Sequence, residues 1–124
     1  MKIKNADNID LLYYYGSSNL ATIVAPDDET VTGSSGDFSW TSDWGTTNAT
    51  RFKVSDVSAS EFDGMEDDSV IATISGMDKK KITELSQDEV IAFQTANEKN
   101  GLIKVVQITD GSNGKIEINV KIQE

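Results

Sequence analysis

The feature that most constrains this chain is a strict alternation of apolar and polar residues near its C-terminal end. Over residues 115–122, Ile116, Ile118, Val120 and Ile122 alternate with lysine, glutamate and asparagine. Successive side chains of a β-strand point to opposite faces of the sheet, whereas an amphipathic helix repeats its apolar residues every three or four positions. The alternation therefore predicts a strand with one face in the core and the other in water.

Two earlier apolar runs, residues 90–95 and 102–108, precede this strand. They are joined by residues 97–101, and the second run is joined to the last strand by residues 110–114. Both connectors have the length and the glycine placement of hairpin loops. The sequence thus predicts a C-terminal three-stranded antiparallel meander.

Residues 86–99 also carry a competing pattern. Ser86 followed three residues later by Glu89 has the form of a helix capping box, and Gly101 would suit the end of such a helix. Strand and helix both remain open here. The β-branched content and the hairpin spacing favour the strand.

Short apolar or aromatic runs separated by Gly, Ser, Asn and Asp clusters continue through the first half of the chain. Such punctuation is typical of many short strands. The predicted strands are residues 9–15, 20–25, 38–40, 51–54 and 70–74, and Pro26 suits the end of the second one. The polar residues 27–37 are predicted to form a long surface loop.

One segment predicts a helix instead. Ser58 and Glu61 form a capping box, and Phe62 and Met65 follow on one helical face, so a one- or two-turn helix is expected over residues 58–65. No repeat, low-complexity tract or linker interrupts the sequence. The expected fold is mainly β, an antiparallel β-sandwich or roll with one or two short helices, in a single domain spanning residues 1–124.

The formal net charge of −10 bears on the choice of partner. An acidic surface repels phosphate backbones and anionic lipid headgroups, so nucleic-acid binding is not expected. The apolar runs are far shorter than the roughly 20 residues of a membrane-spanning helix, so membrane insertion is not expected either.

The chain contains neither histidine nor cysteine. It therefore lacks the commonest general base, thiol nucleophiles and thiolate metal ligands. Most enzyme classes become improbable, and the chain is predicted not to be an enzyme. The remaining catalytic alternative is a carboxylate-dependent glycoside hydrolase, which needs two acidic groups at a fixed separation that the sequence does not reveal.

The candidate ligand site consists of four residues, Trp40, Asp43, Trp44 and Asn48. They lie close together in a stretch rich in turn residues. Aromatic faces stack on the apolar faces of sugar rings, and nearby carboxylate and amide groups bind the hydroxyls, so this set suggests glycan binding. The opposing interpretation places both tryptophans in the core, where tryptophan is mostly found.

Asp63, Glu66, Asp67 and Asp68 form the candidate metal site. Calcium prefers oxygen ligands from loops, and carboxylates supply them, so Ca²⁺ is the candidate ion. The spacing matches no EF-hand loop. Solvated surface charge is the opposing interpretation, and no other cofactor is predicted.

A resemblance to a known group of proteins is found in four stretches of the sequence, residues 9–16, 19–22, 91–95 and 101–105. In strand texture and loop placement they resemble small mature domains of secreted or lipid-anchored surface proteins of Bacteroidetes. The chain departs from a full precursor of that kind in having no lipobox cysteine and no signal segment. The resemblance implies an extracellular or cell-envelope setting and carries over no functional residues.

Composition and resemblance together lead to one functional hypothesis. We expect a non-enzymatic, surface-associated binding or structural domain with a glycan or protein partner. A calcium-dependent adhesion or stability module is the first alternative, and the glycoside hydrolase is the second.

Overall fold

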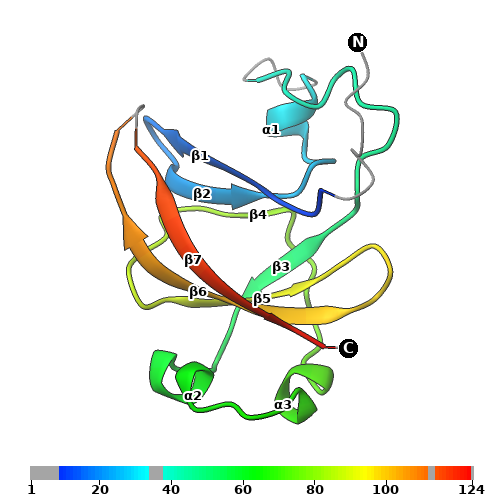
Figure 1. The fold of residues 1–124 in the computed structure, drawn as a ribbon. Helices are drawn as coiled ribbons and strands as arrows, with labels where there is room; N and C mark the ends of the chain where they lie inside the picture. The colour runs from blue at the N-terminus through cyan, green and yellow to red at the C-terminus, as the bar shows by residue number, and fades with distance from the viewer. Residues whose placement is uncertain (1–8, 34–37, 112–113, 124) are drawn as a thin grey trace.

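Two antiparallel sheets pack face to face in the computed structural model, which describes residues 9–33, 38–111 and 114–123 (Figure 1). The first sheet has the order β1-β2-β4, with bounds Leu12–Gly16, Leu20–Val24 and Lys81–Ile82. The second has the order β3-β5-β6-β7, with bounds Arg51–Val54, Val90–Gln94, Asn100–Ile108 and Ile116–Ile122. The predicted mainly β, sandwich-like fold and the C-terminal meander are confirmed.

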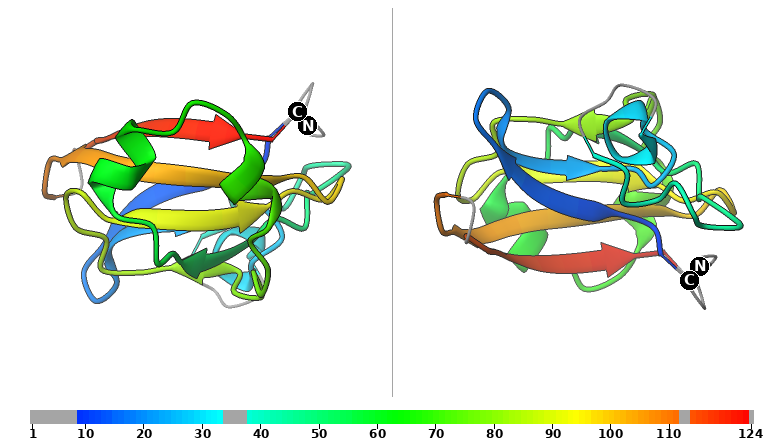
Figure 2. Two further views of the ribbon diagram at one scale, coloured as in Figure 1. Left: turned by 90° about the horizontal axis from the view of Figure 1, so that it is seen from below. Right: turned by 90° about the horizontal axis from the view of Figure 1, so that it is seen from above.

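One stretch of backbone, residues 79–82, connects the two sheets. Lys79 exchanges two hydrogen bonds with Phe52 of β3, at 2.8 and 3.0 Å, and Ile82 pairs with Ile23 of β2. β1 and β7 are the edge strands of the two sheets on the side away from this segment. No strand pairs with their outer sides within the described residues (Figure 2). The arrangement is therefore joined along one side and open along the other.

The main core lies between the two sheets. Four strands each contribute a fully buried side chain to it: Ile23 from β2, Phe52 from β3, Ile91 from β5 and Ile103 from β6. Each buried side chain of this size stabilises the fold by about 1.5–3 kcal/mol relative to an exposed one. Contacts among these residues hold the sheets together.

Two short helices cover the other face of the four-stranded sheet: α2, Ala59–Asp63, and α3, Ser69–Ala72 (Figure 2). Phe62 and Ile71 from these helices pack against Val90, Ala92 and Leu102. β5 and the first half of β6 are therefore buried on both faces. This explains why their sequences are apolar runs rather than alternating patterns.

The helix expected over residues 58–65 is confirmed as α2. Ser58 Oγ accepts a hydrogen bond from Glu61 N at 3.1 Å, and Glu61 Oε1 accepts one from Ser58 N at 3.1 Å. This reciprocal capping box satisfies two of the amide groups that a helix start leaves unpaired. Phe62 then points into the core.

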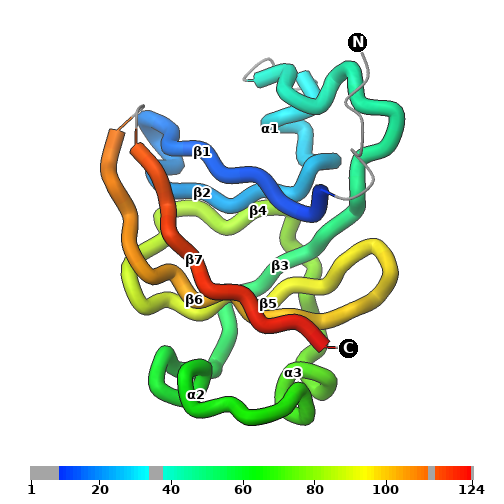
Figure 3. Tube along the Cα trace, in the orientation of Figure 1, coloured from blue at the N-terminus to red at the C-terminus, as the bar shows by residue number. Residues whose placement is uncertain are grey.

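The strand predicted over residues 70–74 is wrong, because the structure forms α3 there. Asp67 Oδ1 accepts hydrogen bonds from Ser69 N and Ser69 Oγ at 3.0 and 2.6 Å, which holds the turn that starts the helix. Ile71 is buried while Val70 is 48% exposed. Figure 3 follows the chain from α3 up to β4.

The surface loop predicted over residues 27–37 is also wrong in part. Residues 34–37 lie outside the described part of the chain, but Glu29–Thr32 form a short helix, α1. Asp28 Oδ1 caps it by accepting from Thr30 N at 2.8 Å, and both Thr30 and Val31 are buried. The polar composition concealed a helix that carries an apolar residue into the core.

Residues 38–40 form no strand, contrary to the prediction. Phe38 N instead donates to Thr30 O at 3.0 Å, which ties this segment to α1. The aromatic side chains of this segment pack with one another and with Tyr14, as described below.

Of the strand and the helix that remained open for residues 86–99, the structure forms the strand, β5. Glu89 Oε1 accepts from Ser86 N at 3.2 Å, which is half of a capping box, but Asp88 has a left-handed φ of 68°. That conformation cannot continue a right-handed helix, so the chain turns directly into β5.

β7 follows the alternation predicted from the sequence only over its first half. Ile116 and Ile118 pack against the core, whereas Val120 is 49% and Ile122 is 46% exposed. A β-bulge between Val105 and Gln107 interrupts the register of the neighbouring β6. In the described part of the chain, no helix is long and apolar enough to cross a membrane.

Candidate functional site

Three aromatic rings pack against one another beside α1. Tyr14, from β1, is buried and lies 5.2 Å from Phe38, centroid to centroid. Phe38 stacks on Trp40 at 4.5 Å with an interplanar angle of 26°. Trp40 is 46% exposed. Tyr14 and Trp40 also meet edge to face, with centroids 6.2 Å apart. The three rings therefore form a compact cluster that reaches from the core to an indole on the surface, and we call this cluster the aromatic row.

Hydrogen bonds on both sides of Trp40 fix its position. Phe38 N donates to Thr30 O at 3.0 Å, and Thr41 N donates to Val31 O at 2.9 Å. Thr41 is buried, and its hydroxyl donates to Pro26 O at 2.9 Å. Trp40 is thus held between two residues that are bonded to α1 or to the segment between β2 and α1.

A polar groove of 340 Å³ adjoins the aromatic row. It is lined by Tyr14, Gly16, Ser17, Ser18, Asn19, Thr30 and Phe38. Asn19 Nδ2 donates to the Tyr14 hydroxyl at 2.9 Å, and Lys81 Nζ donates to Thr30 Oγ1 at 3.0 Å. Ser17 and Ser18 are exposed. Hydroxyl and amide groups therefore line a recess with an aromatic side.

The other members of the predicted ligand site are placed differently. Asp43 is exposed, and Trp44 is half-buried with its Nε1 atom buried and without a hydrogen-bond partner among the described residues. Asn48 Nδ2 donates to Ile9 O at 3.0 Å and to Asp10 Oδ1 at 3.1 Å. The amide of Asn48 thus holds the segment that leads into β1. Of the four predicted residues, the described structure brings only Trp40 into the aromatic row.

The sequence prediction overlooked Tyr14 and Phe38 as partners of Trp40, and it overlooked the turn at residues 17–19 as part of the adjoining groove. The spacing of Phe38 and Trp40 was the available signal, because residues two apart share one side of an extended segment. The contribution of Tyr14 had no such signal, since it comes from a distant strand.

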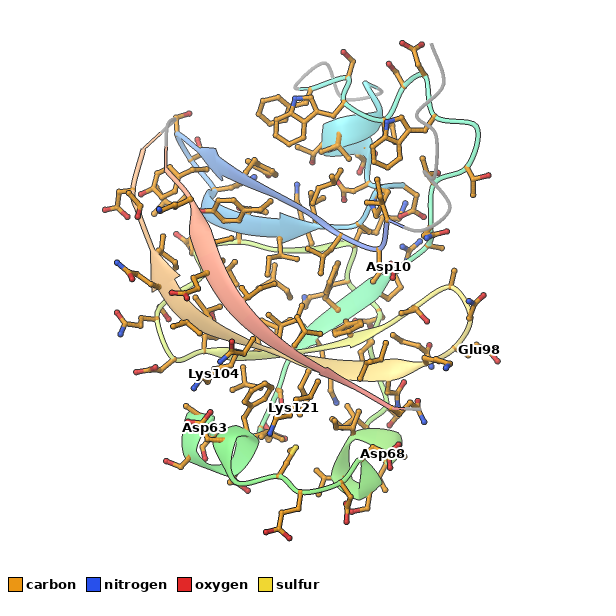
Figure 4. All side chains as sticks on the ribbon, viewed as in Figure 1. Asp10, Asp63, Asp68, Glu98, Lys104 and Lys121 are labelled. Carbon is orange, nitrogen blue, oxygen red and sulfur yellow. The ribbon has the colours of Figure 1, made fainter. Side chains whose placement is uncertain are left out.

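The four acidic residues of the predicted metal site have separate roles. Asp63 Oδ1 lies 2.7 Å from Lys104 Nζ on β6, and Figure 4 shows the two side chains between α2 and the sheet. Asp67 is bonded to Ser69. Asp68 precedes α3, and Glu66 is exposed. Within the described residues, no three acidic side chains come together in a way that could hold a metal ion.

Hydrogen bonding to Ser69 lowers the pKa of Asp67, first through the hydroxyl and then through the backbone amide. A donor to a carboxylate favours its charged form. Asp67 is therefore a fixed negative charge, and this direction is opposite to that required of a general acid near neutral pH.

Arg51 and Asp27 form a second charged contact, near the start of β3. The two guanidinium nitrogens lie 2.9 Å from the two carboxylate oxygens, so the pair is bidentate. The hydrogen bond to Asp27 raises the pKa of Arg51. This pair anchors β3 to the segment before α1 and takes no part in the aromatic row.

A second groove, of 440 Å³, lies beside the C-terminal end of β7. Its walls are Met65, Glu66, Asp67, Asp68, Ile71, Lys121 and Ile122. It therefore combines three acidic side chains from the α2–α3 connection with the exposed end of an edge strand.

Comparison of the chain with protein-family models, with curated proteins and with solved structures finds no match.

Proposed function

We propose that this protein is a non-enzymatic binding domain whose ligand is a glycan held against the indole of Trp40. The observation that carries the proposal is an exposed tryptophan supported from behind, because Trp40 is 46% exposed yet stacks on Phe38 at 4.5 Å. An indole fixed in this way offers a flat apolar face at a low cost in side-chain entropy.

The adjoining polar groove supports the same chemistry. Ser17 and Ser18 present hydroxyls, and Asn19 presents an amide, beside the aromatic row. A saccharide has apolar C–H faces and a periphery of hydroxyl groups, so it needs both kinds of surface next to each other. Nucleic acid would instead meet an acidic chain with a net charge of −10.

The non-enzymatic part of the proposal rests on composition. The chain has no histidine and no cysteine, which removes the usual general base and thiol nucleophile. The extracellular or envelope setting rests on the resemblance of the sequence to mature surface domains.

Tryptophan fluorescence gives a direct test, because the chain contains two tryptophans. In a Trp44→Phe variant, Trp40 is the remaining indole, and a panel of oligosaccharides can be titrated against it. Stacking of a sugar on Trp40 should shift its emission to shorter wavelength in a saturable way. A Trp40→Phe variant, which retains Trp44, is the matched control and should show no shift.

Thermal unfolding separates binding from packing. Trp40→Ala should abolish retention on the glycan that binds while changing the melting temperature little. A loss of about 3–5 kcal/mol would instead assign Trp40 to the core. If no glycan of the panel shifts the Trp40 emission, the proposal fails. Calcium and a chelator, added in the same melting assay, test the alternative of a calcium-dependent module.

A further inference from the structure

Within the described residues, the outer edge of β7 is unpaired, and it is flanked by exposed apolar side chains. β7 is the last strand of the four-stranded sheet, and no described strand pairs with its outer side. Val120 and Ile122 lie on the same face of the sheet as Ile116 and Ile118, which pack against the core. They are nevertheless 49% and 46% exposed. Natural sheets protect or pair such edges, because the unpaired backbone groups bind other strands.

The hydrogen bonds at the two ends of β7 show which residues face outward. Gln123 N donates to Asn100 O at 3.0 Å, and Lys115 O accepts from Thr109 N at 2.8 Å. In an antiparallel pair, alternate residues bond to the neighbouring strand, so the odd-numbered residues of β7 bond inward. The even-numbered residues therefore turn their N–H and C=O groups toward the free edge. These are Ile116, Ile118, Val120 and Ile122.

We propose that β7 pairs with β7 of a second copy of this chain, antiparallel and with Asn119 on the two-fold axis. The even-numbered residues then form the hydrogen-bonded pairs, in which Ile118 faces Val120 of the second copy and Ile116 faces its Ile122. The pairing covers the exposed side chains of Val120 and Ile122, and the two four-stranded sheets become one continuous sheet.

Charge complementarity selects this register. With Asn119 on the axis, Glu117 faces Lys121 of the second copy, and symmetry forms the contact twice. Shifting the axis to Ile118 would set Lys115 against Lys121, and shifting it to Glu117 would set two glutamates opposite each other. Like charges directly opposite destabilise a strand pair, whereas opposite charges stabilise it.

Lys121 is already fixed in position for this contact. Its Nζ atom donates to Phe62 O and lies 4.7 Å from the centroid of the Phe62 ring. Figure 4 shows Lys121 on the side of the sheet that carries α2 and α3. Glu117 is exposed and, as an odd-numbered residue, lies on the same face. Little further side-chain ordering is needed when a carboxylate approaches Lys121.

The groove beside the end of β7 fits the same pairing. In the proposed register, Lys115 of the second copy faces Gln123, next to the groove that Lys121 and Ile122 line. That groove also carries Glu66, Asp67 and Asp68. A lysine of the second copy would therefore meet an acidic wall.

Disulfide trapping tests both the contact and its register, because the chain has no cysteine of its own. Across a non-hydrogen-bonded pair the Cα atoms are about 4.5 Å apart, which is within the range that a disulfide spans. Asn119→Cys should give a covalent dimer on mild oxidation. Glu117→Cys should not, because its two copies would lie roughly 13 Å apart. Glu98→Cys, on the exposed β5–β6 turn, is the control for random collision.

Sedimentation measures the association without cross-linking. The wild type should dimerise in physiological salt, and Glu117→Lys should weaken the dimer roughly tenfold, since two attractive contacts become repulsive. Glu98→Lys makes the same charge change at an exposed turn and should leave the dimer unaffected. Val120→Pro removes an outward amide while sparing the bonds to β6, so it should also abolish the dimer.

Three results would overturn the proposal. One is a wild type that stays monomeric up to about 1 mM. Another is a dimer that Glu117→Lys does not weaken. The third is a Glu117→Cys protein that cross-links as readily as Asn119→Cys.

Discussion

Phe93 and Gly101 lie opposite each other in the β5–β6 hairpin, and the Phe93 ring fills the space that a side chain at position 101 would occupy. A Cβ atom on Gly101 would lie 2.3 Å from Phe93 Cζ and 3.0 Å from Lys121 O. Both contacts are too short, so the ring can pack between the sheets only if position 101 has no side chain.

Gly101→Ala should therefore lower the free energy of unfolding by about 1–3 kcal/mol, the usual cost of overpacking a core. Urea unfolding of the variant against the wild type measures it. Gly64→Ala is the matched control, because a Cβ there would meet Ser60 O at an ordinary 3.4 Å. It should be neutral or slightly stabilising. Equal effects of the two substitutions would contradict the role assigned to the Phe93 ring.

Buried Asn100 connects α3 to the sheet. Its Nδ2 atom donates to Ile71 O at 3.2 Å and to Ile74 O at 2.7 Å. Asn100→Ala leaves these carbonyls without that donor and should cost about 1–3 kcal/mol of stability. Hydrogen exchange around α3 should accelerate more than in β1. Asn97→Ala, in the exposed turn, should have almost no effect, and a similar loss there would count against this explanation.

Tyr13 should make stability depend on alkaline pH. Burial raises its pKa most, and electrostatic interactions with Tyr15 and Asp110 raise it further. Its hydroxyl has no hydrogen-bond partner among the described residues. Since the folded pKa lies above the unfolded value of about 10, the group's contribution is complete below pH 10 and is lost as pH rises through the raised pKa.

Tyr13→Phe should accordingly reduce the loss of stability between about pH 9 and 11 and be neutral or stabilising at pH 7, because an orphan buried hydroxyl is removed. Unfolding curves at the two ends of that range measure the effect. Tyr14→Phe is the control, since it removes the acceptor of the 2.9 Å bond from Asn19. That variant should be destabilised already at pH 7, and an unchanged alkaline slope in Tyr13→Phe would refute the assignment.

Asp67 provides a test at acidic pH. Its pKa is lowered by Ser69, so its carboxylate should stay charged until pH falls below the ordinary range, and its contribution to α3 is lost as pH falls through the lowered pKa. Ser69→Ala should return the pKa toward the ordinary value, as followed by NMR titration of the side-chain carboxyl. Ser42→Ala, at an exposed serine bonded to Ser39 O, should leave Asp67 unchanged.

Predictions from sequence succeeded where the determinant is local. The alternation in β7 and the capping box of α2 depend on residues within a few positions of one another, so spacing alone identified both elements. α3 was missed because Val70 and Ile71 suit a strand by composition. The hydrogen bonds of Asp67 and the burial of Ile71 under the sheet favour a helix there instead.

The candidate site depended on contacts that spacing cannot provide. Whether Trp40 is exposed depends on Phe38 and on Tyr14, which is contributed by β1. Asp63 was grouped with neighbouring acids, yet its partner Lys104 lies 41 residues away in the sequence. Local patterns identify which side chains are available, but the fold decides which of them meet.

The stretch at residues 79–82 has a consequence for how the protein opens. Its backbone bonds to Phe52 on one side, and Ile82 pairs with Ile23 on the other, so β2 and β3 share a single covering segment. When that segment detaches, amides on both strands become accessible to solvent in the same event. Their deuterium uptake should therefore proceed at a common rate, even though the two strands belong to different sheets.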